Sequence, residues 1–527
     1  MTLPDLSVLK KLAEARLISL LETESGDKDV IIDSRIIRLF DFVANFQTLK
    51  FYACEVYLEQ EGIYGDVTIE VLDLELIPMD KDLLSFEVPA IFPSYFAHRD
   101  RSWIKSIAQS LVSSQSLFGE FNRVYTIGDY SKKIWNLAEV LAKNVDSDPN
   151  VMADVSATKL DTLIMIDRGK RGLYFTSINS SYVSRNHRRY IWYRKRSVWL
   201  HCYLVLGPSS NVGKGSIKML LNSSDQIFAN IRDSHITTVF GIIRERAKEI
   251  QSGYDKRHDY KSVSGLKDFV RNEFKDLQSQ HKSLTGHLSL CENLMTTKTK
   301  ENLEYLLTQE SYMLAGTNEK ECLDFIETCI IDKDITSALR LMCLYSVTHD
   351  GLPSAQYHSL WLQFLQSHGY DKLVSTQYVL KKSGLFTEQT TKKNKFKAIC
   401  KKLGLIPKTP TEVDLSKPKS MAYIHGGQYA PMSCKLIEHV LTFPNSFRDD
   451  DDIGKILNCD CSCIINASTI SANRQTPIVM VYFIGGCTYS EIAALRFLGK
   501  QLNTEFLIAT TSVTNSERLL KDVINSA

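Results

Sequence analysis

The sequence lacks a dominant charge and a long apolar run, and its first residues lack the apolar core of a secretory signal. Its 63 Lys and Arg residues nearly balance its 61 Asp and Glu residues, which leaves a formal net charge of +2. No global field therefore favours nucleic acid or a membrane surface. The longest strongly apolar stretch, residues 478–484, is far shorter than the ~20 residues of a membrane-spanning helix. Because the first residues, MTLPDLSVLKKLAEAR, have no apolar core of the secretory type, we expect a cytoplasmic protein.

Cysteine is also sparse, and no catalytic constellation is recognisable. The 12 cysteines are scattered over 527 residues, which favours reduced thiols over a disulfide framework. Cys459, Cys461 and Cys463 alternate in NCDCSC. Zinc sites usually use pairs of Cys with two to four residues between them and need a fourth ligand, so we predict no metal site, although metal binding by these thiols stays open. We predict no catalytic residue and no cofactor.

The stretch YLVLGPSSNVGKGS, residues 203–216, comes nearest to a nucleotide-binding motif. A phosphate-binding loop needs Gly, four residues and then Gly-Lys-Ser/Thr between a strand and a helix. Here five residues separate Gly207 from Gly213, and Gly215 stands where the metal-binding hydroxyl belongs. A nucleotide-binding hydrolase that uses Lys214 is therefore the alternative function, and a surface turn is the preferred interpretation.

One segment differs sharply from the rest of the chain in charge. Residues 169–213 contain eight Lys or Arg residues, eight aromatic residues and no Asp or Glu. Basic and aromatic residues are mixed in this way in segments that bind single-stranded nucleic acid. A nucleic-acid footprint is normally a basic face of a whole domain. We therefore interpret the segment as a solvated loop and expect no nucleic-acid partner.

Strands and helices alternate in the first and last parts of the chain. Short apolar runs at 29–32 and 67–76, and the run TLIMID at 162–167, predict strands, and the period of apolar residues predicts a helix over 103–118. Near the end, a strand over 478–484 meets Gly485-Gly486 and then a helix, where Thr488 and Glu491 have the spacing of a capping box. A further strand at 505–511 and another helix follow. This pattern predicts a parallel α/β layer that the C-terminal segment completes.

The middle of the chain is helical and contains a heptad pattern. Eight residues step alternately by four and three: Val270, Phe274, Leu277, His281, Leu284, Leu288, Cys291 and Met295. The pattern predicts a long helix packed along a partner helix. His281 is the polar member, which we interpret as a residue that sets the register rather than as a metal ligand. We expect this helical part to be inserted into the α/β domain.

Several long stretches resemble one protein family. They are GGCTYSEIAALRFLGK, FYACEVYLEQEGIYGD, SALRLMCLYSVTHDGL, GGQYAPMSCKLIEHVL and TTSVTNSERLL. The first is similar to the C-terminal signature of the Sec/Munc (SM) family, whose members regulate SNARE-mediated membrane fusion. The others resemble the class C vacuolar protein sorting branch, most of all its animal B-type paralogue. The resemblance covers residues 1–167 and 214–527.

The resemblance implies an α/β plus α fold in a three-domain arch. Residues 1–130 would form an N-terminal α/β domain, residues 131–225 and 421–527 a discontinuous parallel α/β domain, and residues 226–420 a helical insertion that faces SNAREs. It also implies a non-enzymatic adaptor that binds SNAREs and a VIPAR-like α-solenoid subunit. Such an adaptor promotes vesicle docking and fusion, and associates peripherally with late endosomes and lysosomes through its partners.

Site residues follow from the same resemblance. In a related protein the solenoid contact uses a Tyr-Ala-Pro stretch, which implies Tyr429 and Met432 as interface residues here. The alternative is that Tyr429 packs inside its own domain, as buried aromatic residues commonly do. SNAREs are helix-forming heptad chains, so we expect them to contact the helical seam at Phe274, Leu277, Leu284 and Leu288.

The chain departs from the family pattern in two places. Family members have additional strand–helix–strand sequence where this chain runs from VANFQTLK directly into FYACEV, so the first domain is expected to be shortened. Where the family has Asp-Arg-x-x-Asp, this chain has Arg171 at the second acidic position. The resemblance then stops until about residue 212. We hypothesise a shifted reading frame over 169–212, which requires that an alternative frame encode an acidic, family-like peptide.

Overall fold

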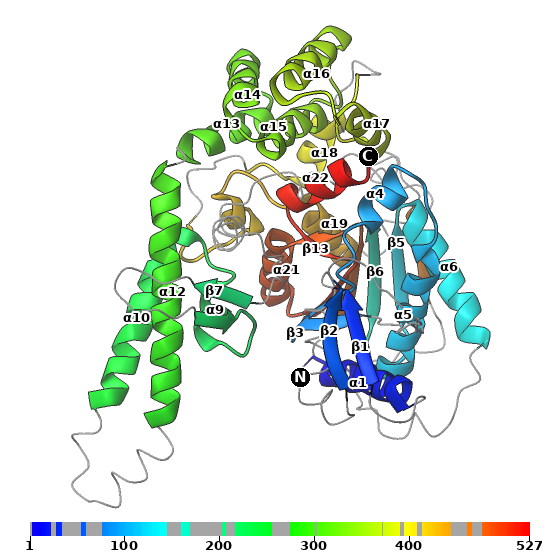
Figure 1. Ribbon diagram of the computed structural model, residues 1–527, viewed down its shortest axis with the longest axis vertical. Helices are drawn as coiled ribbons and strands as arrows, with labels where there is room; N and C mark the ends of the chain where they lie inside the picture. Colours follow the sequence, from blue (N-terminus) through cyan, green and yellow to red (C-terminus); the bar gives the residue numbers. More distant parts are fainter. Residues whose placement is uncertain are drawn as a thin grey trace, which may run out of the picture. The chain divides into compact units, whose positions relative to one another are not determined.

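A computed structural model of the chain shows two compact units (Figure 1). The first unit comprises Met1–Asn179, Leu323–Leu403 and Met432–Ala527, and the second comprises Ser180–Cys322 and Gly404–Pro431. The structure describes residues 3–22, 28–33, 54–59, 76–144, 160–168, 203–206, 217–255, 274–300, 303–371, 373–389, 395–407, 414–443, 461–465 and 477–527.

A seven-stranded sheet forms the centre of the first unit, in the order β3-β4-β12-β10-β6-β5-β9. The five strands from β4 to β5 are parallel, and β3 and β9 are antiparallel to their neighbours at the two edges. The strands are β3 (Ile77–Asp80), β4 (Leu83–Ser85), β5 (Arg123–Ile127), β6 (Thr162–Asp167), β9 (Cys461–Ile465), β10 (Ile478–Ile484) and β12 (Glu505–Thr510).

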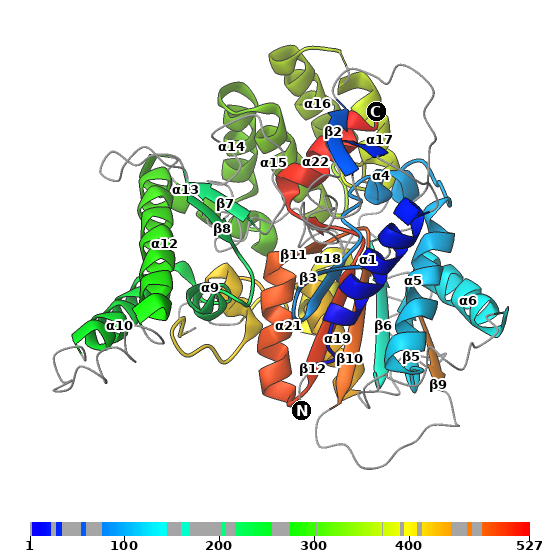
Figure 2. The same ribbon diagram turned by 60° about the horizontal axis from the view of Figure 1, so that its bottom comes forward.

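The two central strands are buried along their whole length. Every residue of β6 and of β10 is buried, as expected for parallel strands with helices on both faces. Figures 1 and 2 show the sheet between α5 (Trp103–Phe118) and α6 (Asp129–Asn144) on one side and α21 (Tyr489–Leu502) on the other. The strands predicted at 162–167 and 478–484 and the helix predicted over 103–118 are confirmed, and so is the α/β class.

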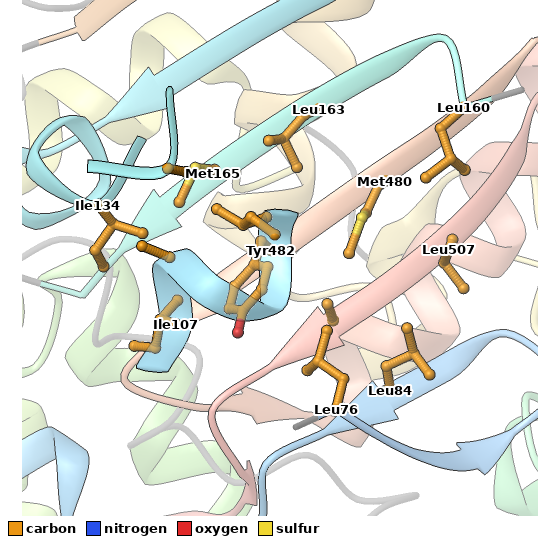
Figure 3. Close-up of a cluster of buried hydrophobic side chains, with 14 of the residues drawn as sticks. Leu76, Leu84, Ile107, Ile134, Leu160, Leu163, Met165, Met480, Tyr482 and Leu507 are labelled. Carbon is orange, nitrogen blue, oxygen red and sulfur yellow. The ribbon is translucent and has the colours of Figure 1, made fainter. Parts of the chain in front are cut away.

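One face of the sheet supplies the main hydrophobic core of the first unit (Figure 3). Met165 of β6 and Tyr482 of β10 point from this face toward Ile107 of α5 and Ile134 of α6, and all four side chains are almost completely buried. Leu163, Met480 and Leu507 extend the same layer across three neighbouring strands. Alternate strand residues thus bind the α5–α6 pair to the sheet.

The other elements of the first unit are helices and two small parallel sheets. The sheets are β1 (Lys28–Asp33) with β2 (Cys54–Glu59), and β11 (Cys487–Thr488) with β13 (Val513–Thr514). The helices are α1 (Ser7–Glu22), α4 (Ile91–Phe96), α15 (Ile335–Thr348), α16 (Ser354–His368), α17 (Leu373–Ser383), α18 (Lys395–Leu403), α19 (Met432–Thr442) and α22 (Ser516–Asn525). Within the described ranges, no helix of either unit is long and apolar enough to cross a membrane.

The second unit is built on a helical hairpin. Its elements are β7 (Tyr203–Leu206), β8 (Ile217–Leu220), α9 (Gln226–Ile231), α10 (Ile236–Asp255), α12 (Phe274–Lys300), α13 (Leu303–Ala315) and the 3-10 helix η5 (Met421–His425). α10 and α12 pack along each other, so the predicted long helix and its partner helix are both present (Figure 1). α14 (Glu319–Asp332) begins in the second unit and ends in the first.

The phosphate-loop hypothesis fails on the flanking structure. β7 and β8 are antiparallel neighbours in which Leu206 pairs with Ile217. The 207–216 segment therefore connects two strands of a hairpin, whereas a phosphate-binding loop leads from a strand into a helix whose N-terminus faces the phosphates. Lys214 itself lies outside the described residues.

Two other predictions concern residues that are mostly outside the described part of the chain. All but the last residue of the strand predicted at 67–76, and most of the basic segment at 169–213, lie outside the described residues, so those predictions stay untested. The boundary predicted at residue 130 does not coincide with an edge of the main sheet, because β3, β4 and β5 precede it and pair with strands that follow it. The three-domain division stays a prediction.

The C-terminal helix provides a prediction on pH. Burial raises the pKa of Asp522 on α22 from its ordinary value of 3.8 to about 6, against the opposing effects of Arg518 and Lys521. The folded chain thus keeps this proton up to about pH 6, while the unfolded chain loses it near pH 4, so the group lowers stability as pH rises between these values. We expect Asp522→Asn to raise the free energy of unfolding at pH 7 by about 1 kcal/mol, because it removes the buried charge and partial exposure already screens part of that charge's cost.

Urea unfolding of both proteins at pH 4 and at pH 7 measures this difference. Asp324→Asn on α14, where the side chain is exposed, serves as the matched control and should change neither value. An equal gain at both pH values would contradict the assignment to Asp522 titration.

Candidate functional site

Open α/β sheets bind their ligands at the carboxyl edge of the sheet, so a functional site is expected at that edge of the main sheet. Asp167 ends β6 at this edge. Its Oδ2 accepts hydrogen bonds from the backbone N–H groups of Tyr130 (2.8 Å) and Ser131 (3.3 Å) at the start of α6. Gly128 leaves room for the carboxylate, because a Cβ built there would lie 2.1 Å from Oδ2 of Asp167. The chain's own carboxylate thus occupies the anion-binding end of this helix.

The next residue forms a fully buried ion pair with α21. Arg168 Nη2 donates to Oε2 of Glu491 at 2.5 Å, and both side chains are 0% exposed. Arg168 Nε also donates to the carbonyl oxygen of Gly486 at 3.0 Å, in the turn after β10. Burial alone would lower the pKa of Arg168, but the Glu491 carboxylate holds it above its ordinary value, so the guanidinium stays charged.

Glu491 satisfies several other groups at the same time. It completes the predicted capping box: Oε2 accepts from the backbone N–H of Thr488 at 2.9 Å, and Thr488 Oγ1 accepts from the backbone N–H of Glu491. Its Oε1 accepts a hydrogen bond from Ser433 Oγ on α19. The capping box is confirmed, and its carboxylate joins β6, the start of α21 and α19 in one network.

Two thiols border this network without becoming reactive. Cys434 and Cys487 are completely buried. Burial, and then the charge of Glu491, raise the pKa of both thiols well above their ordinary value, so both stay protonated. The polar groups named at this edge are engaged with one another, which suits a structural role rather than a catalytic one.

The predicted solenoid-binding residues are buried. Tyr429 is 0% exposed, and its ring meets His425 of η5 edge to face, with 5.5 Å between centroids. Ala430 N donates to the Leu405 carbonyl oxygen at 2.8 Å, which holds the following backbone. Met432, the first residue of α19, is also 0% exposed. This burial agrees with the alternative that Tyr429 packs inside the fold, and a part in partner binding stays a prediction for both residues.

The predicted SNARE-facing seam divides into two kinds of residue. Leu277 lies against Gly253 of α10, Phe274 meets the Tyr254 ring with 6.0 Å between centroids, and Leu284 packs on the cluster formed by α9 and α10. These three residues therefore hold the hairpin together. Leu288 is 42% exposed and is the member of the predicted set that presents an apolar surface.

A polar clamp at the base of the hairpin was not predicted. Asp225 begins α9: its Oδ1 accepts from the backbone N–H groups of Ile227 (2.9 Å) and Phe228 (3.0 Å). Its Oδ2 accepts from Ser283 Oγ (2.8 Å) and lies 3.1 Å from Nε2 of His287, both on α12. Burial alone would raise the pKa of Asp225, but the bonds from His287 and the backbone hold it below its ordinary value.

The heptad pattern predicted that His281 is the polar residue in the packed surface of the long helix, but the structure shows His287 in that position. The His287 side chain is 0% exposed and stacks on Phe228, with 6.3 Å between ring centroids. His281 is exposed. His287 follows Leu284 by three residues and precedes Cys291 by four, so the helix places it on the same side as these two seam residues, whereas His281 lies at the margin of that side. The signal that could have identified the clamp is the Asn-Ser-Ser-Asp run at 222–225, which is typical of a helix N-cap.

Two of the three alternating cysteines that could bind a metal ion lie on β9. Cys461 and Cys463 are half-buried, and Cys463 pairs across the ladder with Tyr125 of β5. Cys459 lies outside the described residues. In the ranges that the structure describes, no three His, Cys, Asp or Glu side chains are grouped so that they could hold a metal ion.

Comparisons with known proteins agree on one family. The Sec1 family model matches residues 39–170 and 203–522. The chain is 32% identical to human vacuolar protein sorting-associated protein 33B over 615 aligned positions, which cover 98% of this chain and 97% of the relative. It is 29% identical to the vacuolar protein-sorting-associated protein 33 homolog of Arabidopsis thaliana, with 91% and 81% covered.

Solved structures share the fold at low identity. The SM protein Vps45 in complex with the Qa SNARE Tlg2 matches with a TM-score of 0.62 and 12% identity, and 98% of each chain is covered. The Unc18–syntaxin 1 complex from Monosiga brevicollis matches with a TM-score of 0.60 and 14% identity, with 98% of this chain and 99% of that chain covered.

The alignments also bear on the two departures from the family pattern. The 615 aligned positions exceed the 527 residues of this chain, so the human relative has residues where this chain has none. The family model leaves out residues 171–202, which fall inside the segment where the motif resemblance stops.

The buried ion pair yields a prediction on stability. Glu491→Gln or Arg168→Leu should each lower the free energy of unfolding by about 3–5 kcal/mol, because each leaves an uncompensated buried group. The double variant R168L/E491Q should lose less than the sum of the two. Chemical denaturation of the four proteins gives the coupling free energy.

The surface pair Lys521–Glu517 provides the control. These side chains are 45% and 28% exposed, and Lys521→Gln should cost under about 0.5 kcal/mol. Strictly additive losses at Arg168 and Glu491 would show that the pair does not act as a unit.

The hairpin clamp yields a second prediction. Asp225→Asn keeps an N-cap acceptor but weakens the bonds to Ser283 and His287, so we expect a loss of about 1–2 kcal/mol at pH 7. Since the pKa of Asp225 is depressed in the folded chain, its contribution should fade as pH falls below the ordinary carboxyl range. The control is Asp334→Asn at the start of α15, where the side chain bonds to nearby Thr336 and Ser337 of its own helix. Equal losses in the two variants would contradict the clamp.

Proposed function

The chain belongs to the Sec1 family, and from that premise we propose that it is a regulator of SNARE proteins in vesicle-mediated transport. Sec1-family proteins are SM proteins, which regulate SNAREs and are not enzymes. The closed carboxyl edge of the main sheet fits a non-enzymatic role, because Asp167, Arg168 and Glu491 bond to the protein itself. The resemblance to vacuolar sorting proteins supports a role on the route to late endosomes and lysosomes.

The SNARE proposal rests on the α10–α12 hairpin, which presents exposed apolar residues on both of its helices. SNAREs form helices with heptad-spaced apolar residues, and such helices bind along apolar helical surfaces. Leu288 on α12 and Phe240 on α10 are 42% and 36% exposed. We propose that these two residues contact a SNARE helix, while Phe274, Leu277 and Leu284 act by keeping the hairpin rigid. Two solved structures that share the fold are complexes, one with the Qa SNARE Tlg2 and one with syntaxin 1, which supports this class of partner.

The second proposed partner is a VIPAR-like α-solenoid subunit. Since Tyr429 and Met432 are buried, we propose that they support the interface by fixing the backbone of residues 420–432 rather than by direct contact. The η5 turn supports this reading: Ser420 caps it, and Tyr423 Oη donates to the carbonyl oxygen of Asp233 at 2.7 Å.

The hydrolase alternative has no remaining support in the flanking structure. A nucleotide site would require a strand-to-helix connection at residues 207–216, and these residues join antiparallel strands. We therefore do not propose nucleotide binding.

The SNARE proposal predicts the effect of a charge on the hairpin. Leu288→Asp should weaken binding to a Qa-SNARE helix at least about fivefold, because an apolar contact is replaced by a solvated carboxylate. The dissociation constant is measured by titrating the purified protein with purified Qa-SNARE motifs from the same organism. Leu362→Asp on α16, where the leucine is 51% exposed, is the matched control and should bind normally. Normal binding by Leu288→Asp would remove this residue from the interface.

The solenoid proposal predicts a graded series at Tyr429. Tyr429→Phe keeps the ring and should retain the solenoid subunit in a pull-down, whereas Tyr429→Asp buries a charge and should lose both the partner and several degrees of Tm. Loss of the partner by Tyr429→Asp at an unchanged Tm would instead indicate direct contact.

A further inference from the structure

The outward side of α17 presents apolar and basic side chains together. Val374 and Tyr378 are 54% and 58% exposed, and Lys381 and Lys382 at the end of the helix are exposed as well. A helix turns by about 100° per residue, so these four side chains lie on one side of α17, within an arc of about 100°. We name these four residues the α17 face.

The packing of α17 onto the first unit uses its other side. The helix contacts α4 and α22 (Figures 1 and 2). Its buried residues are Leu373, Thr376, Val379, Leu380 and Ser383. The α17 face therefore contributes little to folding of the described part of the unit. Exposed apolar side chains clustered beside charges are typical of a surface that binds something else.

The segment around the face is strongly basic. Residues 373–403 contain eight lysines, no arginine and one acidic residue, Glu388, which gives a formal charge of +7 in a chain whose total is +2. Glu388 offsets Lys381 only in part: Oε2 lies 3.6 Å from Lys381 Nζ, while Oε1 lies 3.0 Å from His358 Nε2. Exposed lysines continue on α18 at Lys395, Lys397, Lys401 and Lys402.

This combination of residues fits a lipid surface better than a protein. Tyrosine is enriched where headgroups meet acyl chains, and lysine adds its apolar stem and a charge that anionic headgroups attract. Lys382 Nζ lies 5.4 Å from the centroid of the Tyr378 ring, so the cation and the aromatic surface are presented together. Protein interfaces instead favour arginine and are depleted in lysine.

We propose that the α17 face binds directly to an anionic lipid bilayer. Val374 and Tyr378 enter the headgroup layer, and Lys381 and Lys382 lie against the lipid charges. This goes beyond the proposed function, which concerns protein partners, and it depends on neither SNARE nor solenoid binding.

Vesicle flotation with the purified full-length chain tests the proposal. The chain should float with phosphatidylcholine vesicles that contain about 30% phosphatidylserine, far less with phosphatidylcholine alone, and less as salt rises. K381Q/K382Q should weaken binding roughly ten- to thirtyfold, because each lysine near such a surface contributes about a factor of five. V374S/Y378S should weaken it at least about fivefold.

Two double variants serve as matched controls. K10Q/K11Q on α1 removes the same charge from exposed positions, and V140S/F443S removes exposed apolar side chains of 54% and 57% exposure elsewhere. Both should float like the unmodified chain. The proposal is wrong if the chain floats equally well with and without phosphatidylserine. It is also wrong if the control variants lose as much binding as the α17 variants, or if the α17 variants bind normally. Binding to a polyglutamate peptide through the α17 face without vesicle binding would make it a surface for acidic proteins and also overturn the proposal.

Discussion

The ion pair between Arg168 and Glu491 is the contact on which the first unit depends. Its members are 323 residues apart in the chain and are completely buried together. A charge removed from water needs its partner and the remaining hydrogen bonds, so this pair fixes the geometry of everything it touches. It joins the end of β6 to the turn after β10 and to the start of α21. The sheet is therefore complete only when the last segment of the chain has been added, after the helical middle.

At the carboxyl edge of the main sheet, the protein's own side chains occupy the positions where other α/β proteins bind a ligand. In α/β proteins the helix N-termini and loops at the carboxyl edge face a ligand. Here Asp167 occupies the start of α6 and Glu491 the start of α21. The same backbone groups that could bind phosphate stabilise the scaffold instead. The surfaces proposed here for recognition, Leu288 for a SNARE helix and the α17 face for a lipid bilayer, lie instead on the outer sides of helices.

The sequence predicted those parts of the structure that local patterns determine. The buried strands at 162–167 and 478–484 are short apolar runs, and the Thr488–Glu491 box is a three-residue spacing, so each could be identified without the fold. The family and its branch were also identified from motifs, and the comparisons confirm them. The clamp between Asp225 and His287 could not be identified in this way, because it joins residues 62 apart and its burial depends on how α9 meets α12. The burial of Tyr429 depends likewise on η5, a turn that has no periodic signal.

The antiparallel pairing of β7 and β8 has a consequence for how the chain tolerates change. Since Leu206 and Ile217 are directly opposite each other, the two ends of the intervening segment are held about 5 Å apart. A segment with fixed, adjacent ends can differ in length and composition at a modest entropic cost, because loop closure depends only weakly on loop length. A fluorescent protein or an affinity tag inserted between these strands would leave the path of the chain on either side unchanged. The connection between these two strands is thus a suitable internal position for a label.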